Sequence, residues 1–277
     1  IRWLGEADCH DDAVVGGKAA SLSRLAAAHA VPPGFAVPAL LSHHQDLPVA
    51  LAPAISAAYR MLAERLGATD PRVAVRSSAI DEDGTDSSFA GQHDTYLNIC
   101  GVDALLDAVM RCARSAGSPQ ALAYRSRQGL PLDDVRIAVL VQSLVPADVS
   151  AVVFSANPVT GSRDEVMINA SWGLGESIVG GSVTPDTFVI NKDNLELAWR
   201  DISRKERMTV MTATGTAEID VPAELQLKAS LDAGQVQELG ALALRLERLL
   251  GHEVDIECAF AGGELYLLQC RPITTLR

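Results

Sequence analysis

The chain has 277 residues, enough for one large domain or two lobes, and no apolar stretch approaches the ~18 residues that cross a bilayer. Acidic residues outnumber basic ones 35 to 23, and a net charge of −12 opposes the phosphate contacts that drive non-specific nucleic-acid binding, so we expect no nucleic-acid partner. The sequence as given opens without the basic and apolar segments of a secretory signal, so we expect a cytoplasmic protein with no membrane as partner. Its five cysteines are scattered and never in Cys-x-x-Cys spacing, which fits reduced thiols rather than a disulfide frame or a zinc site.

Segments with helical and with strand periodicity alternate along the chain. In chain order we expect helices over residues 18–28 and 51–66, a strand over 72–76, a helix over 102–114, strands over 135–145, 149–155, 165–169 and 187–191, a helix over 235–250 ended by Gly251, and strands over 253–260 and 264–271. This pattern predicts an α+β fold. A crossing point around residues 142–147 separates a first lobe at 1–142 from a second lobe at 143–277.

Two glycines and a lysine, Gly16-Gly17-Lys18, open the first predicted helix. A helix N-terminus offers backbone N–H groups and a positive dipole to a phosphate. The segment departs from the P-loop pattern, because Ala19 stands where a Ser or Thr would hold Mg²⁺. By themselves, these residues favour a structural turn with a surface lysine.

Arg76 ends a predicted strand and precedes an acidic loop of small residues. An arginine on a rigid strand suits anion binding, but an ion pair with Asp81, Glu82 or Asp83 explains it equally well. A second cluster of glycines, in residues 172–181, follows a buried strand, and tight turns are the favoured interpretation there.

The last two predicted strands form a hairpin with polar residues on one face. Alternation puts Asp255 and Glu257 on the face opposite to the apolar residues of the same strand. For Glu257 to oppose Gln269, the hairpin must close around a three-residue loop at 262–264. Glu257, Gln269 and Arg271 would then form a platform for Mg²⁺ and phosphate. A solvent-facing strand with a Glu257–Arg271 ion pair is the open alternative.

Motifs of three common enzyme classes are missing from the sequence. There is no Gly-x-Ser-x-Gly elbow of a serine hydrolase, and no Gly-x-Gly-x-x-Gly follows a strand. None of the six histidines stands at zinc spacing or beside a nucleophile. Hydrolase, dinucleotide and zinc chemistry are therefore not expected.

Short blocks in a fixed order cover nearly the whole chain. They are residues 15–22 (VGGKAASL), 31–35 (VPPGF), 73–79 (VAVRSSA), 88–92 (SFAGQ), 94–96 (DTY), 156–161 (ANPVTG), 169–176 (NASWGLGE), 183–186 (VTPD) and 265–274 (LYLLQCRPIT). Together they resemble the nucleotide domain of the phosphoenolpyruvate synthase and pyruvate phosphate dikinase family, which includes rifampicin phosphotransferase and the ATP subunit of phenylphosphate synthase. The resemblance implies an ATP-grasp-like fold with ATP in a cleft between two lobes.

The resemblance also implies roles for residues of the first lobe. Lys18 and Arg76 would contact phosphates of ATP. Gly91 and Thr95 would belong to the loop that covers the phosphates, and Gln142 would lie on the adenine side near the hinge.

In the second lobe the resemblance assigns three more residues. Glu257 and Gln269 would bind Mg²⁺ or the nucleotide, and Arg271 would hold a phosphate. Lys18, Arg76 and Arg271 are thus the expected catalytic residues, Glu257 and Gln269 the expected metal ligands, and ATP and Mg²⁺ the cofactors.

The sequence departs from the family pattern in several places. Only 34 residues separate Pro38 from Val73, where relatives carry a longer insertion, and residues 81–84 are unusually acidic. Cys258 follows Glu257, where relatives often have an aromatic residue. No Thr-x-Gly-Gly-x-x-x-His segment is present. We therefore expect the phosphohistidine-bearing swivelling domain and the acceptor-substrate domain to be separate partners, or parts of a longer protein from which this chain is cut.

The leading functional hypothesis is an ATP-binding module that passes a phosphoryl group from Mg-ATP to a histidine on a separate domain, giving AMP. Two alternatives stay open. One is a regulatory nucleotide-binding module without turnover, and the other is the ATP half of a ligase-like condensing enzyme.

Overall fold

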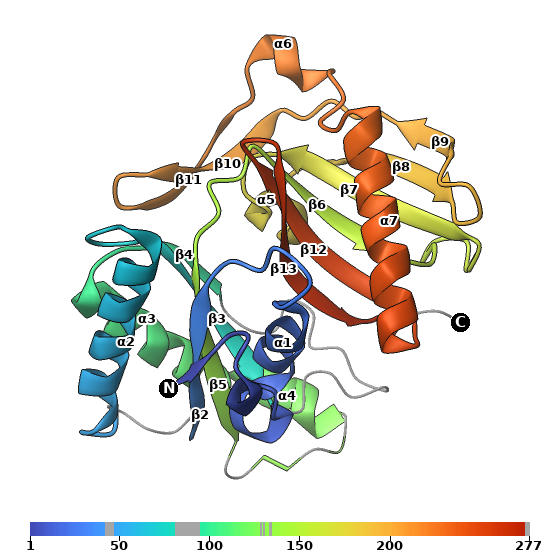
Figure 1. Cartoon of the computed structure of the whole chain (residues 1–277). Helices are drawn as coiled ribbons and strands as arrows, with labels where there is room; N and C mark the ends of the chain where they lie inside the picture. The colour runs from blue at the N-terminus through green and yellow to red at the C-terminus, as the bar shows by residue number, and fades with distance from the viewer. Residues whose placement is uncertain (42–46, 81–94, 128, 130, 133–134, 275–277) are drawn as a thin grey trace. The chain divides into compact units, whose positions relative to one another are not determined.

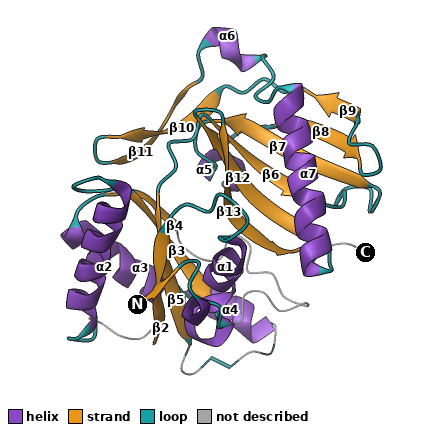
Figure 2. Ribbon diagram, viewed as in Figure 1, coloured by secondary structure: helices purple, strands orange, loops and turns teal. Residues whose placement is uncertain are grey.

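The computed structural model describes residues 1–41, 47–80, 95–127, 129, 131–132 and 135–274. These residues form two compact units, which we call unit 1 (Ile1–Leu144 with Thr212–Gly215) and unit 2 (Val145–Met211 with Thr216–Arg277). Each unit contains helices and one large sheet, so the predicted α+β class is confirmed (Figures 1 and 2). No helix in the described ranges is both long and apolar enough to span a membrane.

Unit 1 is built on a five-stranded antiparallel sheet in the order β1-β2-β5-β3-β4. Its strands are β1 (Arg2–Trp3), β2 (Gly34–Leu41), β3 (Val73–Ala79), β4 (Thr95–Ile99) and β5 (Arg136–Ser143). Its helices are η1 (Ala7–Cys9), α1 (Asp12–Leu25), α2 (Leu51–Leu66), α3 (Val102–Ser115) and α4 (Pro119–Arg127). The boundary expected after Gln142 falls inside β5, and the contacts divide the chain after Leu144.

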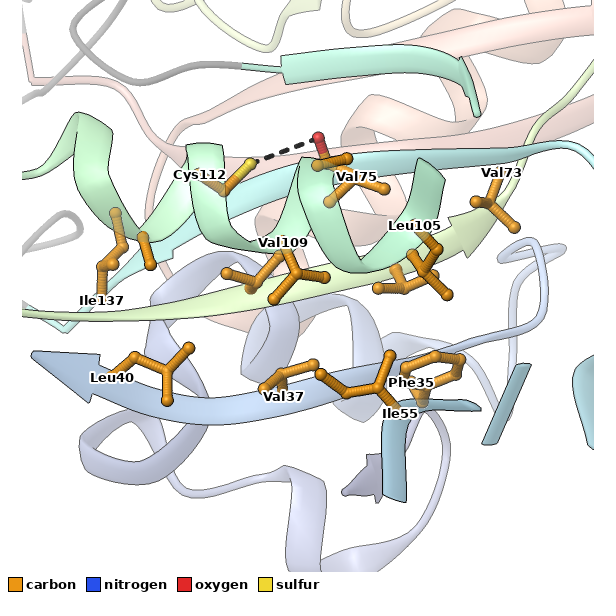
Figure 3. Packing of buried hydrophobic residues seen from close by; sticks show 14 of the residues in the cluster. Phe35, Val37, Leu40, Ile55, Val73, Val75, Leu105, Val109, Cys112 and Ile137 are labelled. Atoms are coloured by element: carbon orange, nitrogen blue, oxygen red, sulfur yellow. Dashed lines mark hydrogen bonds between the residues drawn. The ribbon is translucent and has the colours of Figure 1, made fainter. Parts of the chain in front are cut away.

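The two faces of this sheet carry different side chains, because successive strand residues point to opposite faces. One face is aliphatic and packs with α2 and α3 in the main core (Figure 3). Phe35, Val75 and Ile137 of this core are fully buried, and each such side chain stabilises the fold by about 1.5–3 kcal/mol. The other face, which α1 contacts, carries small residues such as Ala36 and Ser78 beside the larger Arg76, Leu140 and Gln142.

Helix α1 begins earlier than predicted and is kinked. Asp11 caps it by accepting a hydrogen bond from the N–H of Ala13, at 3.0 Å. Gly16 has non-helical angles, φ 74° and ψ 161°, so the backbone changes direction there. The predicted start at residue 18 corresponds to the segment after this kink. The sequence pattern located that segment but missed the turn before it.

Strand β2 was not predicted, because Pro38 interrupts its apolar pattern. Proline cannot donate a ladder hydrogen bond and is tolerated in a sheet only at edges or bulges. The pairing of β2 with β5 shifts between Val37 and Leu40, so Pro38 lies in an irregular part of the ladder. Hydrogen-bonded pairing with β5 on both sides of this shift therefore stabilises β2 as a strand despite Pro38.

Unit 2 is built on a six-stranded sheet in the order β13-β12-β6-β7-β8-β9, with a separate hairpin, β10–β11. Its strands are β6 (Val149–Phe154), β7 (Glu165–Trp172), β8 (Asp186–Asn191), β9 (Leu197–Asp201), β10 (Arg207–Thr212), β11 (Gly215–Asp220), β12 (Val254–Ala261) and β13 (Glu264–Pro272). Its helices are α5 (Glu176–Val179), α6 (Ala223–Gln226) and α7 (Ala233–Leu250). Thr212–Gly215, at the tip of the hairpin, are grouped with unit 1.

Helix α7 covers one face of the six-stranded sheet (Figure 2). Asp232 and Gln235 form a capping box at its start, and Gly251 ends it in left-handed conformation, as predicted. Gly240 packs against Ile190 of β8, which places the even-numbered residues of β8 on the helix side. We call the opposite side of this sheet the open face.

Candidate functional site

Lys18 lies against strand β3, although 59 residues separate it from its contact there. Its Nζ donates a hydrogen bond to the carbonyl oxygen of Ser77 at 2.9 Å, and the N–H of Ala19 donates to Oγ of Ser78 at 3.1 Å. A Cβ on Gly16 would lie 2.1 Å from the Ser78 carbonyl oxygen, so only glycine permits this approach. The Gly-Gly-Lys segment is therefore packed against β3 and is not a solvated surface turn.

Three further expected site residues share the sheet face that α1 covers. Arg76 directly opposes Thr95 of β4, and Gln142 of β5 opposes Ala74, two residues before Arg76. Opposed residues and residues two apart share a face, so Arg76, Thr95 and Gln142 lie on the same side as Ser78. The structure thus brings four expected residues of unit 1 to one side of one sheet.

Gln142 has a structural contact as well. Its side chain is buried, and Nε2 donates to the carbonyl oxygen of Pro32 at 3.1 Å, which ties the Pro-rich segment before β2 to the sheet. Gly91 lies outside the described residues. The acidic residues 81–83, the alternative partners of Arg76, lie outside them too.

The β12–β13 hairpin closes differently from the prediction. Ala261 pairs with Glu264 around a two-residue turn, so the expected three-residue loop is wrong. Gly262 and Gly263 both have positive φ, 59° and 85°, and two such residues in succession form the tight turn that matches strand twist.

Glu257 nevertheless directly opposes Gln269, as predicted. The register shifts between Glu257 and Cys258, which leaves Leu268 as an extra residue on β13. This β-bulge offsets the shorter turn, and without it Glu257 would oppose Leu268. The carboxylate and the amide therefore lie side by side on the open face.

Arg271 forms an ion pair with Asp255, the residue directly opposite on β12. Its Nε and Nη2 donate to Oδ2 of Asp255 at 2.9 and 2.7 Å. Burial raises the pKa of Asp255, and the Arg271 guanidinium opposes that rise. Sequence reasoning put Asp255 on the right face but gave it no role. Its position two residues before Glu257 was the available signal.

The open face carries a row of directly opposed residues that crosses all six strands and is polar at every position except Val152. The directly opposed residues are Gln269, Glu257, Val152, Asn169, Thr187 and Asp201, in the order of the strands. Thr187 Oγ1 donates to Oδ1 of Asn169 at 2.9 Å. Asn169 and Thr187 were not singled out from the sequence, because only the pairing of distant strands aligns them with Glu257.

The end of this row formed by Glu257 and Gln269 is suited to binding a hard cation. Mg²⁺ prefers oxygen ligands and is usually held by one or two carboxylates together with substrate phosphates. Glu257 supplies a carboxylate and Gln269 an amide oxygen. Within the described ranges, no group of three or more His, Cys, Asp and Glu residues could hold a metal by itself. The donor set therefore fits Mg²⁺ only together with oxygens of a ligand.

The second glycine cluster is a structural turn, as favoured from the sequence. Gly173 has φ 77°, and a Cβ there would lie 2.4 Å from the carbonyl oxygen of Thr209. The N–H of Leu174 donates to that same oxygen at 2.9 Å. Gly173, the first glycine after β7, thus serves close packing against β10.

Asp186 forms a buried ion pair that was not predicted. Its Oδ1 accepts from Nζ of Lys205 at 2.6 Å, and both side chains are fully buried. The N–H of Ser203 donates to Oδ1, and the N–H and Oγ of Ser230 donate to Oδ2. Asp186 thus ties two loops to the start of β8.

The family model for the pyruvate phosphate dikinase AMP/ATP-binding domain matches residues 39–277. A probable phosphoenolpyruvate synthase of Methanocaldococcus jannaschii is 37% identical over 318 residues, covering 100% of this chain and 27% of the relative. Because 318 exceeds the length of this chain, the relative is longer within the matched region. The phosphoenolpyruvate synthase of Pyrococcus furiosus is 41% identical over 241 residues, covering 84% of this chain and 30% of the relative.

One solved structure, D-alanyl-alanine synthetase A of Vibrio cholerae, aligns with a TM-score of 0.40 at 12% identity, covering 98% of this chain and 58% of that one. The chain spans less than a third of the two phosphoenolpyruvate synthases. The matched residues include β3 with Arg76 and the whole β12–β13 hairpin. The chain therefore belongs to the pyruvate phosphate dikinase AMP/ATP-binding domain family, which its residue blocks predicted from the sequence.

Proposed function

We propose that this chain is the ATP-binding module of a dikinase-type phosphotransferase, which passes a phosphoryl group from Mg-ATP to a histidine on a separate domain or subunit. The observation that carries the proposal is the hydrogen bond from Lys18 to Ser77. It joins two segments, Gly-Gly-Lys and Arg-Ser-Ser, that the family resemblance assigns to the phosphates. The family match supports this function over the regulatory and ligase-like alternatives.

In unit 1, Lys18 and Arg76 bind phosphate oxygens and neutralise the charge that develops during transfer. Both lie on a rigid support, because Lys18 is held on β3 and Arg76 is part of it. Thr95, the first residue of β4, lies opposite Arg76 and directly follows the segment with Gly91 that the family resemblance assigns to covering the phosphates. Gln142 lies on the adenine side.

In unit 2, Glu257 and Gln269 hold Mg²⁺ together with the phosphates. The metal supplies further charge neutralisation and orients the phosphates. Arg271 binds a phosphate, and its pair with Asp255 fixes the plane of the guanidinium. A bidentate or paired arginine positions a phosphate better than a flexible lysine does.

Calorimetry with Mg-ATP tests this proposal. Wild-type protein is expected to bind Mg-ATP, and Glu257→Gln is expected to weaken that binding at least tenfold while the melting temperature changes little. Glu264→Gln is the matched control, because it removes the same charge from the exposed first residue of β13 in the same hairpin. No binding at millimolar Mg-ATP would refute the proposal.

A second experiment addresses the product. Labelled ATP is incubated with the chain, with and without the histidine-bearing domain. The chain alone is expected to turn ATP over slowly, since a closed phosphate site excludes water. Addition of the domain is expected to give AMP. Partner-dependent ADP as the sole product would leave an ordinary kinase half-reaction.

A further inference from the structure

The kink at Gly16 creates a new helix start inside α1. Gly16 has non-helical angles, and the helical residues that follow are Gly17, Lys18 and Ala19. The first N–H groups of a helix have no partner within it. They are normally satisfied by the side chain of the residue just before the helix, which accepts from the second or third N–H. Gly16 has no side chain to do this.

Ser78 of β3 supplies the missing acceptor. Its Oγ accepts from the N–H of Ala19, the third residue after the kink, at 3.1 Å. Ser78 is fully buried, and its carbonyl oxygen lies 2.1 Å from the position that a Cβ of Gly16 would take. Because Gly16 has no side chain, Ser78 can come close enough for its hydroxyl to cap the helix. A strand distant in sequence caps the helix that carries Lys18.

We infer that Ser78 is a positioning residue for Lys18. Its hydroxyl fixes the first turn after the kink, and the neighbouring Ser77 carbonyl fixes the lysine amine at 2.9 Å. Two adjacent residues of β3 therefore hold the backbone and the side chain of this turn. This inference rests on the proposed role of Lys18 in phosphate binding.

The test compares two serines with the same chemistry. Ser23 is also buried in unit 1, on α1 itself, and its Oγ accepts from the N–H of Gly5 at 2.9 Å. Ser23→Ala removes a comparable hydrogen bond away from Lys18. Both alanine variants are expected to lower the melting temperature by similar amounts.

The affinities for Mg-ATP and for adenosine are expected to distinguish Ser78→Ala from Ser23→Ala. Ser78→Ala is expected to weaken Mg-ATP binding about fivefold, because binding would have to restore the turn that the lost helix cap no longer fixes, and to leave the binding of adenosine unchanged. Ser23→Ala is expected to change neither. A loss of general stability would affect ATP and adenosine alike, so the ratio of the two affinities reports the phosphate contact.

A second readout needs no nucleotide. The rate of reductive methylation of Lys18, followed by mass spectrometry with exposed Lys228 as internal reference, is expected to rise several-fold in Ser78→Ala and to stay unchanged in Ser23→Ala. Equal methylation rates in all three proteins would overturn the inference, as would equal ATP affinities. If the wild type bound no Mg-ATP, the proposed function would fail, and the methylation rates would still decide whether Ser78 positions Lys18.

Discussion

Gly173 and Gly181 both have left-handed backbone angles, φ 77° and 68°, but only Gly173 is crowded. A Cβ at Gly173 would lie 2.4 Å from the Thr209 carbonyl oxygen, whereas none of the surrounding described atoms lies within 4 Å of a Cβ at Gly181. Substituting alanine at each of these two glycines therefore separates the energetic cost of the left-handed backbone angle from the cost of the steric clash with Thr209.

We expect Gly181→Ala to lower the free energy of unfolding by about 1 kcal/mol, through the left-handed angle alone. Gly173→Ala adds an overpacking term and should cost about 3 kcal/mol. Urea denaturation of both variants measures the difference. Equal losses would show that β10 moves away from Gly173 at little cost.

The buried pair of Asp186 and Lys205 is asymmetric. Asp186 accepts three hydrogen bonds besides that of Lys205, from Ser203 and Ser230, whereas the Lys205 amine donates to one further group among the described residues, the Ser203 carbonyl oxygen. Removing one partner leaves the other charge buried, and the remaining hydrogen bonds decide how much this costs.

Asp186→Asn is therefore expected to destabilise the fold by about 3–5 kcal/mol, because it leaves a buried ammonium group without a counter-charge. Lys205→Met should cost less, about 1–3 kcal/mol, since three donors still satisfy the carboxylate. Thermal and urea unfolding check the order. A larger loss for Lys205→Met would contradict it.

At the scale of elements, the contact between α7 and β8 depends on Gly240. A Cβ there would lie 2.1 Å from Cδ1 of Ile190. Within a helix, alanine is favoured over glycine by about 1 kcal/mol, but overpacking a core costs about 1–3 kcal/mol. The clash should therefore outweigh the helix propensity.

Gly240→Ala alone is expected to destabilise unit 2 by up to about 2 kcal/mol, the overpacking cost less the gain in helix propensity. Ile190→Val alone should cost about 1 kcal/mol, because it removes a buried methyl group, Cδ1. The double variant should be at least as stable as Gly240→Ala, since valine lacks the clashing atom. A double-mutant cycle with no coupling would mean that α7 shifts as a whole.

The hairpin shows how two local features offset each other. The two glycines shorten the turn by one residue relative to the prediction, and the bulge at Leu268 restores the pairing of Glu257 with Gln269. Because each residue of slip reverses the face of every side chain beyond it, this compensation keeps the polar groups on the open face.

At the scale of the whole molecule, ligand binding and stability are linked. A ligand that binds only the folded state stabilises it by about 2.7 kcal/mol at a hundred times its Kd. We therefore expect saturating Mg-ATP to raise the melting temperature and EDTA to abolish most of that rise. Differential scanning calorimetry of wild type and Glu257→Gln checks this. An equal rise for both proteins would remove Glu257 from the metal site.

Much of the fold followed from the sequence by itself. Helices α2, α3 and α7 were predicted within about two residues, because amphipathic spacing and capping glycines are local signals. Strands β6, β12 and β13 were also predicted. Pro-containing β2 was missed because its partner β5 is distant in sequence. Strand β9 and the hairpin β10–β11 were missed because they bury few residues, so no alternating apolar pattern marks them.

The family and the residue types of the candidate site were likewise present in the sequence, in blocks whose order identified them. Only the tertiary structure decided their contacts: Lys18 with Ser77, Ser78 with Ala19, Asp255 with Arg271, and Glu257 with Gln269 through a bulge. Sequence patterns report which face a residue prefers. Register and close approach depend on how distant strands pair and on where a glycine lets two backbones meet, and packing of the whole unit settles both.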